Sequence, residues 1–179
     1  MLEGLDEINW SQLHHAYGKA SDVPILIRQL LSNKITVVDH AIYELFGNIY
    51  HQRTVYEASA YAVPFLQELL SIADLANDTK MSIACLLASM ADGYDIKDGS
   101  YLQKTQEAVE KNIKLLFPYL SCENPTVRKC IAGALSHYPQ YSTETLPILE
   151  KALVSENDEE AKEKIVEAVA TLKLKQAKL

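Results

Sequence analysis

The stretch NPTVRKCIAGALS, residues 124–136, carries the pattern that decides the fold. Four of its apolar or small residues lie at relative positions 0, 4, 7 and 8: Val127, Ile131, Ala134 and Leu135. This spacing places them on one face of an α-helix. Asn124 followed by Pro125 is typical of a helix start, because asparagine caps free amides and proline fits the first turn. The stretch therefore predicts an amphipathic helix that needs a partner for its apolar face.

The same spacing recurs elsewhere in the chain. It begins again at Val37, Thr79 and Ala161, so successive copies start 42, 48 and 34 residues apart (37 to 79, 79 to 127, 127 to 161). The copy at Val37 is the loosest, because Glu44 occupies a position that is apolar or small in the other copies. A mean spacing of about 40 residues favours two-helix units of the HEAT or armadillo kind over the shorter ankyrin and tetratricopeptide repeats.

A second motif precedes each copy. The tripeptide Pro-apolar-Leu occurs four times, at residues 24–26, 64–66, 118–120 and 147–149, each time inside an apolar stretch. A polar break containing asparagine follows each one, at Asn33, Asn77, Asn124 and Asn157. The sequence thus alternates a proline-containing helix with a helix of the first kind, as in a chain of helical hairpins.

We predict a single all-α domain over residues 1–179, a right-handed α-α superhelix of about four HEAT-like helical hairpins plus an N-terminal helix. The expected bounds are 8–20 for the N-terminal helix and 21–50, 54–91, 101–138 and 141–173 for the repeats. Each hairpin would bury its apolar side against the next. The second helix of each hairpin would line a concave side, where we expect a ligand to bind.

The charge of the chain limits its partners. Its formal net charge is −7, with 17 Lys and Arg against 24 Asp and Glu. Nucleic-acid binding relies on clustered Lys and Arg, so no nucleic acid is expected as a partner. An acidic surface instead favours another protein, and a basic one in particular.

Several chemistries lack support in the sequence. The cysteines Cys85, Cys122 and Cys130 are odd in number and lack CxxC spacing, which favours a reducing, cytoplasmic setting over a disulfide or zinc framework. No apolar run is long enough to span a membrane, and no secretory signal is evident at the N-terminus. No nucleophile motif, phosphate loop or His-Glu pair occurs, so we expect no enzyme activity, metal or cofactor.

The stretch at 124–136 resembles the second helix of a HEAT repeat, with Asn124 in place of the usual aspartate and Cys130-Ile131 in place of an alanine pair. Two further stretches, WSQLHHAYGKASDVP (10–24) and IYHQRTVYEASAYAVPFL (49–66), resemble blocks of a group of bacterial HEAT-repeat proteins of undetermined role. Arg53 stands where that group more often has glycine. The resemblance implies a bacterial interaction protein and brings no catalytic residue with it.

Polar and aromatic residues near the first repeat are the candidates for partner binding. They are Trp10, His14, Tyr17, Tyr43, Tyr50, His51, Arg53 and Tyr56. Tyrosine and arginine are common at the energetic centres of interfaces, so Tyr50, Arg53 and Tyr56 could form a recognition patch. A structural reading stays open, in which His51 and its neighbours cap helix ends while Trp10, His14 and Tyr17 cover the end of the core.

The leading hypothesis is a non-catalytic protein-protein interaction module of the HEAT-repeat type, monomeric and cytoplasmic. A more specific version is an immunity protein that neutralises a basic bacterial toxin. The competing hypothesis is a HEAT-like DNA glycosylase, in which Trp10, Tyr43 or Tyr50 would stack on a base. The acidic charge disfavours the glycosylase.

Overall fold

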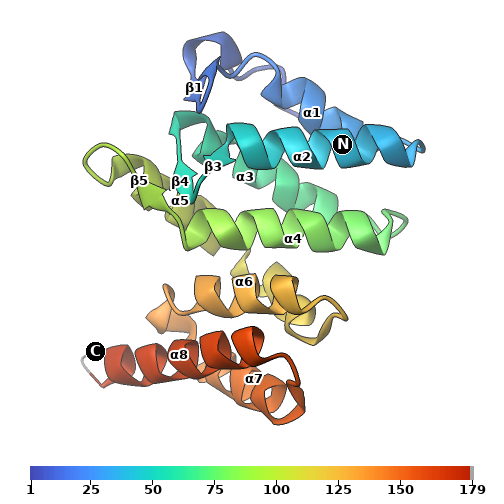
Figure 1. Ribbon diagram of the computed structural model, residues 1–179. Helices are drawn as coiled ribbons and strands as arrows, with labels where there is room; N and C mark the ends of the chain where they lie inside the picture. Colours follow the sequence, from blue (N-terminus) through green and yellow to red (C-terminus); the bar gives the residue numbers. More distant parts are fainter. Residues whose placement is uncertain (178–179) are drawn as a thin grey trace.

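The computed structural model describes residues 1–177, and its helices fall into four consecutive units (Figure 1). The first unit is α1 (Val23–Gln29) with α2 (Ile35–Asn48), and the second is α3 (Glu57–Leu70) with α4 (Asn77–Ala91). The third contains α5 (Ser100–Glu110), the 3-10 helix η2 (Ile113–Ser121) and α6 (Pro125–Leu135). The fourth is α7 (Ser142–Ser155) with α8 (Glu159–Gln176). The architecture is an all-α repeat superhelix, as the sequence predicts.

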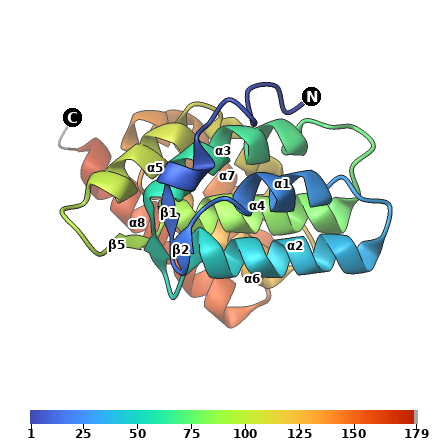
Figure 2. The ribbon, with the colours of Figure 1, turned by 90° about the horizontal axis from the view of Figure 1, so that it is seen from above.

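The helices form two layers. Figure 1 shows α2, α4, α6 and α8 stacked side by side in that order, and Figure 2 shows the view down this stack. We call these four the inner helices. Contacts run from α2 to α4, from α4 to α6 and from α6 to α8, whereas α3 packs on α5 in the other layer. The second helices of the predicted hairpins therefore share one face of the molecule.

The repeated sequence positions lie on the core side of the inner helices. Residues at relative position 4 are completely buried in all four copies: Ala41, Ile83, Ile131 and Ile165. A further shared position, at relative position 11, is buried as well: Asn48, Met90, Tyr138 and Leu172. Complete burial of a large aliphatic side chain stabilises the fold by roughly 1.5–3 kcal/mol. The helical period therefore determines which residues form the core.

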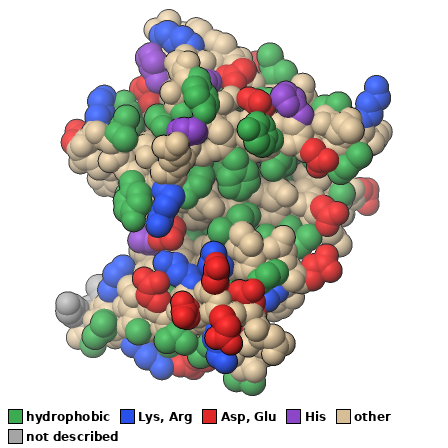
Figure 3. All heavy atoms as spheres, in the orientation of Figure 1, with side chains coloured by type: hydrophobic (Ala, Val, Ile, Leu, Met, Phe, Trp, Pro, Cys, Tyr) green, Lys and Arg blue, Asp and Glu red, His purple; other side chains and the backbone are tan. Residues whose placement is uncertain are grey.

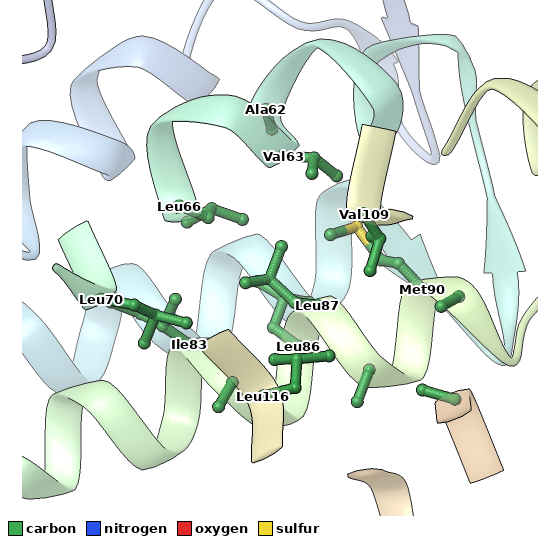
Figure 4. Packing of buried hydrophobic residues seen from close by; sticks show 14 of the residues in the cluster. Ala62, Val63, Leu66, Leu70, Ile83, Leu86, Leu87, Met90, Val109 and Leu116 are labelled. Atoms are coloured by element: carbon green, nitrogen blue, oxygen red, sulfur yellow. The ribbon is translucent and has the colours of Figure 1, made fainter. Parts of the chain in front are cut away.

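The centre of this core lies where α3, α4, α5 and η2 converge (Figure 4). Leu66 from α3 and Leu87 from α4 are almost fully buried there, together with Val109 from α5 and Leu116 from η2. The second and third units are thus joined by one continuous apolar core. Within the same region, Pro64 lies inside α3 and not at its start.

The N-terminal segment differs from the prediction of a helix over residues 8–20. It forms a short 3-10 helix, η1 (Trp10–Gln12), and an antiparallel hairpin of β1 (His14–His15) and β2 (Gly18–Lys19). Gly18 has a φ of +126°, a left-handed conformation that a continuing α-helix excludes and glycine tolerates. The apolar residues Leu13 and Ala20 are buried, as they would be in a helix, which explains the misleading pattern.

Short strands also connect the second unit to its neighbours, which the sequence did not predict. The strands β3 (Tyr50–His51) and β4 (Thr54–Val55) form a hairpin after α2, and β5 (Tyr94–Asp95) adds to β4 in parallel. A Cβ atom at Gly93 would lie 3.0 Å from the Arg53 carbonyl oxygen, so this approach of the two segments depends on glycine. These strands fix the ends of α2 and α4 relative to each other.

A buried ion pair joins the third and fourth units. Arg128 donates from Nε and Nη2 to the two carboxylate oxygens of Glu156, each at 2.6 Å, and from Nη1 to the Cys122 carbonyl at 2.8 Å. The Glu156 side chain is only 1% exposed and also accepts from the amides of Asn157 and Asp158. At the equivalent position in the second unit, Lys80 donates to the Ala73 carbonyl at 3.1 Å. In these two units the basic residue that follows the first apolar position, Lys80 or Arg128, therefore ties the inner helix to the segment that precedes it.

We expect Arg128→Ala to lower the free energy of unfolding by roughly 3 kcal/mol, because it leaves the Glu156 carboxylate buried without its partner. Urea unfolding followed by circular dichroism measures the change. Lys129→Ala is the matched control, since Lys129 makes an exposed ion pair with Glu160 and its loss should cost less than about 1 kcal/mol. Equal costs for the two variants would contradict the importance of the buried pair.

The same pair makes stability depend on pH. The hydrogen bond from Arg128 holds the pKa of Glu156 at about 2, below its ordinary value of 4.5, despite the opposing effect of burial. The stabilising contribution is therefore complete above pH 4.5 and is lost as the pH falls toward 2. We expect the stability difference between the native chain and Glu156→Gln to shrink over this range, as measured by urea unfolding at several pH values.

Candidate binding surface

The inner face carries a groove between α2 and α4. It consists of two adjoining hollows of about 340 Å³ and 360 Å³ that share Ile35, Val38 and Thr79. We call the two together the α2–α4 groove. The first hollow also includes Ile42, Tyr43 and Phe46, and the second includes Leu31, Ile72 and Leu75. Figure 3 shows hydrophobic side chains gathered on this face over α2 and α4.

Three large hydrophobic side chains in this groove are open to solvent. Tyr43 is 75% exposed, Ile35 is 61% exposed and Leu31 is 37% exposed. Exposed apolar surface of this kind, grouped in a hollow, is typical of a site that binds another molecule. The α2–α4 groove is therefore the best-defined candidate for binding on the inner face.

The groove has an acidic border. Asp39 and Asp78 line the first hollow, and Asp74 lines the second. Among the residues that the structure describes, no lysine or arginine lines either hollow. The groove therefore offers apolar contacts together with negative charge, an arrangement that suits a basic ligand with apolar side chains.

The groove lies where α2 packs less closely on α4 than α6 does. Ile42 and Phe46, on this side of α2, are only partly buried. Glu44, the misfit of the first repeat copy, does not line either hollow. A helix that does not close fully on its neighbour leaves this hollow between them.

A second site, which is polar, lies on the inner face near the end of α4. Asp92, after α4, accepts a hydrogen bond of 2.7 Å from His137 Nε2 when that nitrogen is protonated, and lies 3.7 Å from Lys164 Nζ and 3.9 Å from Arg53 Nη2. We call these four residues the Asp92 cluster. They come from different parts of the fold: the β3–β4 turn, the end of α4, the segment after α6, and α8. The cluster borders a hollow of about 290 Å³.

The charges of this cluster are balanced by mutual contacts. Burial raises the pKa of Asp92, but the hydrogen bond from His137 and the positive charges of Lys164 and Arg53 outweigh it and hold the pKa below its usual value. Asp92 is thus ionised at neutral pH. A Cβ atom at Gly133 would lie 2.7 Å from Lys164 Cε and 2.9 Å from Asp92 Oδ2, so glycine leaves the space in which these two side chains meet.

Arg53 occupies a strained position in the β3–β4 turn. Gln52 and Arg53 have φ angles of +48° and +68°, a left-handed pair of the kind usually formed by Asn-Gly. Each non-glycine residue in this conformation costs about 1–2 kcal/mol. The guanidinium of Arg53 lies 4.9 Å from the centre of the Tyr94 ring and near Asp92, contacts that a glycine would lack.

The structure separates the eight predicted site residues into distinct places. Trp10 is buried, 4% exposed, and its indole donates to the Leu5 carbonyl at 2.8 Å. This burial fits the structural alternative, in which Trp10 covers the end of the core, and a role in partner binding stays a prediction. Tyr43 lies in the α2–α4 groove, whereas Tyr50 and Arg53 border the hollow of the Asp92 cluster. Burial raises the pKa of Tyr50.

The remaining four predicted residues gather around the N-terminal hairpin. The Tyr17 hydroxyl lies 3.2 Å from His51 Nδ1, and His14 Nδ1 lies 3.4 Å from the Glu57 carboxylate. Tyr56 is half-buried at the start of α3, where its amide donates to Ser59 Oγ at 2.8 Å. Tyr17 is 69% exposed. These contacts connect the hairpin to the second unit, and they lie at the surface.

Most of the residues that make the groove were not predicted from the sequence. Ile35, Asp39 and Asp78 were not candidates, because they lie outside the repeated positions on which the prediction rested. Asp92, His137 and Lys164 were missed as a cluster, and no spacing in the sequence connects them. Among residues 1–177, no group of three or more metal-ligating side chains occurs, and no helix has the length and apolarity to cross a membrane.

The fold resembles designed helical repeat proteins. No family model and no curated protein matches the sequence. Among solved structures, an engineered protein has a TM-score of 0.59 at 20% identity, covering 87% of this chain and 64% of its own. A designed armadillo repeat protein has a TM-score of 0.57 at 20% identity, covering 84% and 63%. Another, solved in complex with the peptide (KR)4, has a TM-score of 0.55 at 20% identity, covering 84% and 63%.

These similarities show an all-α helical repeat fold like that of the designed armadillo repeat proteins. This chain spans less than two thirds of the length of these three structures. At 20% identity the likeness concerns the fold alone. The HEAT subclass suggested by the sequence is not distinguished by these neighbours, which are armadillo-like.

We expect Arg53→Gly to relieve turn strain and lose side-chain contacts at the same time. Gln52→Gly is the matched control, because it relieves similar strain at a neighbouring exposed residue. Gln52→Gly should raise the free energy of unfolding by about 1 kcal/mol, and Arg53→Gly should raise it less because its contacts with Tyr94 and Asp92 are lost. Urea unfolding measures both, and an equal gain would show that the Arg53 contacts contribute nothing to stability.

Proposed function

We propose that this chain is a non-catalytic protein-protein interaction module of the HEAT-repeat type, and that its α2–α4 groove receives a basic segment of another protein. The observation that carries the proposal is the groove itself. It combines exposed Ile35 and Tyr43 with acidic Asp39 and Asp78, and no lysine or arginine lines it among the described residues.

Each part of the groove has a physical role in this proposal. Tyr43 and Ile35 would provide the buried centre of the interface, where aromatic and aliphatic contacts contribute most of the binding energy. Asp39 and Asp78 would attract a basic segment and fix its position, which affects the association rate more than the final affinity. The net charge of −7 acts in the same direction over longer distances.

A designed armadillo repeat protein of similar fold was solved with the peptide (KR)4, so a fold of this kind can hold an extended basic peptide. The binding of this chain to a basic segment is a proposal that rests on its own groove. We further propose a bacterial cytoplasmic setting and a monomeric state. An immunity protein that masks a basic toxin is a more specific version, favoured by the negative charge.

The groove predicts a defined binding response. The probe is a fluorescently labelled octapeptide of alternating lysine and leucine, followed by anisotropy at increasing salt. Tyr43→Ser should weaken its binding about 10-fold, equivalent to the loss of about 1.4 kcal/mol at an interface centre. Asp39→Asn with Asp78→Asn should weaken binding and reduce its salt dependence, because two carboxylates no longer attract the lysines.

Matched controls lie elsewhere on the surface. Tyr61→Ser removes an exposed tyrosine from α3, and Glu7→Gln with Glu163→Gln removes two exposed charges outside the groove. These variants should bind the probe as the native chain does. If they weaken binding as much as the groove variants, the peptide is held by general charge and hydrophobicity, and the assignment of the groove fails.

A duplex DNA titration separates the module from the glycosylase alternative. We expect no binding at micromolar concentrations, because the groove is acidic and the positive residues of the Asp92 cluster are paired with Asp92. Micromolar binding that weakens steeply with salt would instead favour the glycosylase.

A further inference from the structure

Two cysteines face each other across the contact between the second and third units. Cys85 on α4 and Cys130 on α6 are 45 residues apart in the sequence, and their Sγ atoms lie 3.3 Å apart. Both side chains are partly exposed. A disulfide has an S–S distance of about 2.05 Å, so a small rotation of the two side chains would bring the sulfurs within bonding distance.

One of these two thiols lines the hollow at the Asp92 cluster. Cys130 borders this hollow of about 290 Å³, together with Ser89, Lys129 and Lys164, whereas Cys85 is not among its lining residues. A small molecule that enters this hollow therefore meets Cys130. Cys85 lies outside the hollow lining, within reach of the Cys130 sulfur.

The surroundings of Cys130 favour its thiolate. Cys85 donates its S–H to Cys130 Sγ at 3.3 Å, and Ser89 Oγ donates to the same sulfur at 3.6 Å. The hydrogen bond from Cys85 lowers the pKa of Cys130 against the effect of burial, with further help from Ser89 and from the positive charge of Lys129. The same hydrogen bond raises the pKa of Cys85. The thiolate is the reactive form of cysteine, so the two thiols differ in reactivity.

We infer that Cys130 and Cys85 form a redox-active pair, in which Cys130 reacts with a small peroxide and Cys85 closes a reversible disulfide between α4 and α6. This inference goes beyond the proposed binding function. It rests on the facing sulfurs and on the hollow that exposes one of them. Transient disulfides of this kind are the usual form of disulfide in a reducing compartment.

The chemistry proceeds in two balanced steps. The Cys130 thiolate attacks one oxygen of hydrogen peroxide, the O–O bond breaks, and the products are a sulfenic acid on Cys130 and hydroxide. The Cys85 sulfur then attacks the Cys130 sulfur, an S–S bond forms, and the sulfenic hydroxyl leaves with the Cys85 proton as water. Two electrons pass from the two thiols to the peroxide. A thiol reductant restores both thiols by exchange.

The test uses the full chain in its reduced form. One equivalent of hydrogen peroxide is added at pH 7, free thiols are blocked with N-ethylmaleimide, and intact mass is measured. The chain has three cysteines, so the expected product carries one blocked thiol instead of three. Peptide mapping should join the segments that contain Cys85 and Cys130, and dithiothreitol should restore three blocked thiols.

Three variants separate the roles of the cysteines. Cys122→Ser is the matched control and should form the disulfide at the native rate, because Cys122 lies outside the pair. Cys85→Ser should leave a sulfenic acid on Cys130 that dimedone traps. Cys130→Ser should slow the loss of thiols at least 10-fold. Circular dichroism verifies that each variant is folded, and Cys85→Ala replaces Cys85→Ser if that variant is not.

Other outcomes would overturn the inference. Preferential oxidation of Cys122 would place the reactive thiol elsewhere. A disulfide between two chains, or overoxidation of Cys130 without a link to Cys85, would show that the facing sulfurs do not form a functional pair.

Discussion

The whole fold depends on the fact that no inner helix can bury its apolar stripe without its neighbours in both layers. The residues at relative position 4 are completely buried because each inner helix packs on a helix of the other layer and on a neighbouring inner helix. The stripe of α8, the last inner helix of the stack, is less complete, and Val169 there is only partly buried. The stacking order and the shared face of the inner helices both follow from this requirement. The groove and the Asp92 cluster are built on that shared face.

The groove and the cluster show two ways in which a repeat array acquires a distinctive surface. The α2–α4 groove lies on the side of α2 that carries exposed Ile35 and Tyr43, where α2 packs loosely on α4. The Asp92 cluster exists because the ends of several helices and a hairpin turn converge where the regular pattern stops. In both cases the candidate site is formed mainly by residues outside the repeated apolar stripe, which separates the site from the residues that stabilise the stack.

The helical pairs were predictable because a local period of the sequence determines them. The fully buried Ile131 and Ile165 were recognised from spacing alone, and so was the cap at Asn124, which accepts from the Thr126 amide at 3.0 Å. The N-terminal hairpin was not predictable, because its apolar residues fit a helix equally well and only the backbone at Gly18 decides between the two.

The candidate site was less accessible to sequence reasoning. Tyr43, Tyr50 and Arg53 were identified by residue type, and the structure places them in two separate hollows. The residues that meet in a site are distant in the sequence, as the contact between Asp92 and Lys164 shows. Arg128 lies within the stretch that predicts the helix, but its partner Glu156 lies 28 residues further on. Contacts of this range depend on how the helices stack, and no local pattern encodes them.

Gly133, as a glycine without a side chain, affects how cooperatively the repeat array unfolds. In an ideal repeat protein each unit contacts only its immediate neighbours, so the units can unfold nearly independently. Because Gly133 leaves space on α6, Lys164 of the fourth unit reaches Asp92 of the second across the third. This contact skips a unit, and it makes opening of the second unit sensitive to the state of the fourth. The stack should thus behave more like one cooperative body than like four separable hairpins.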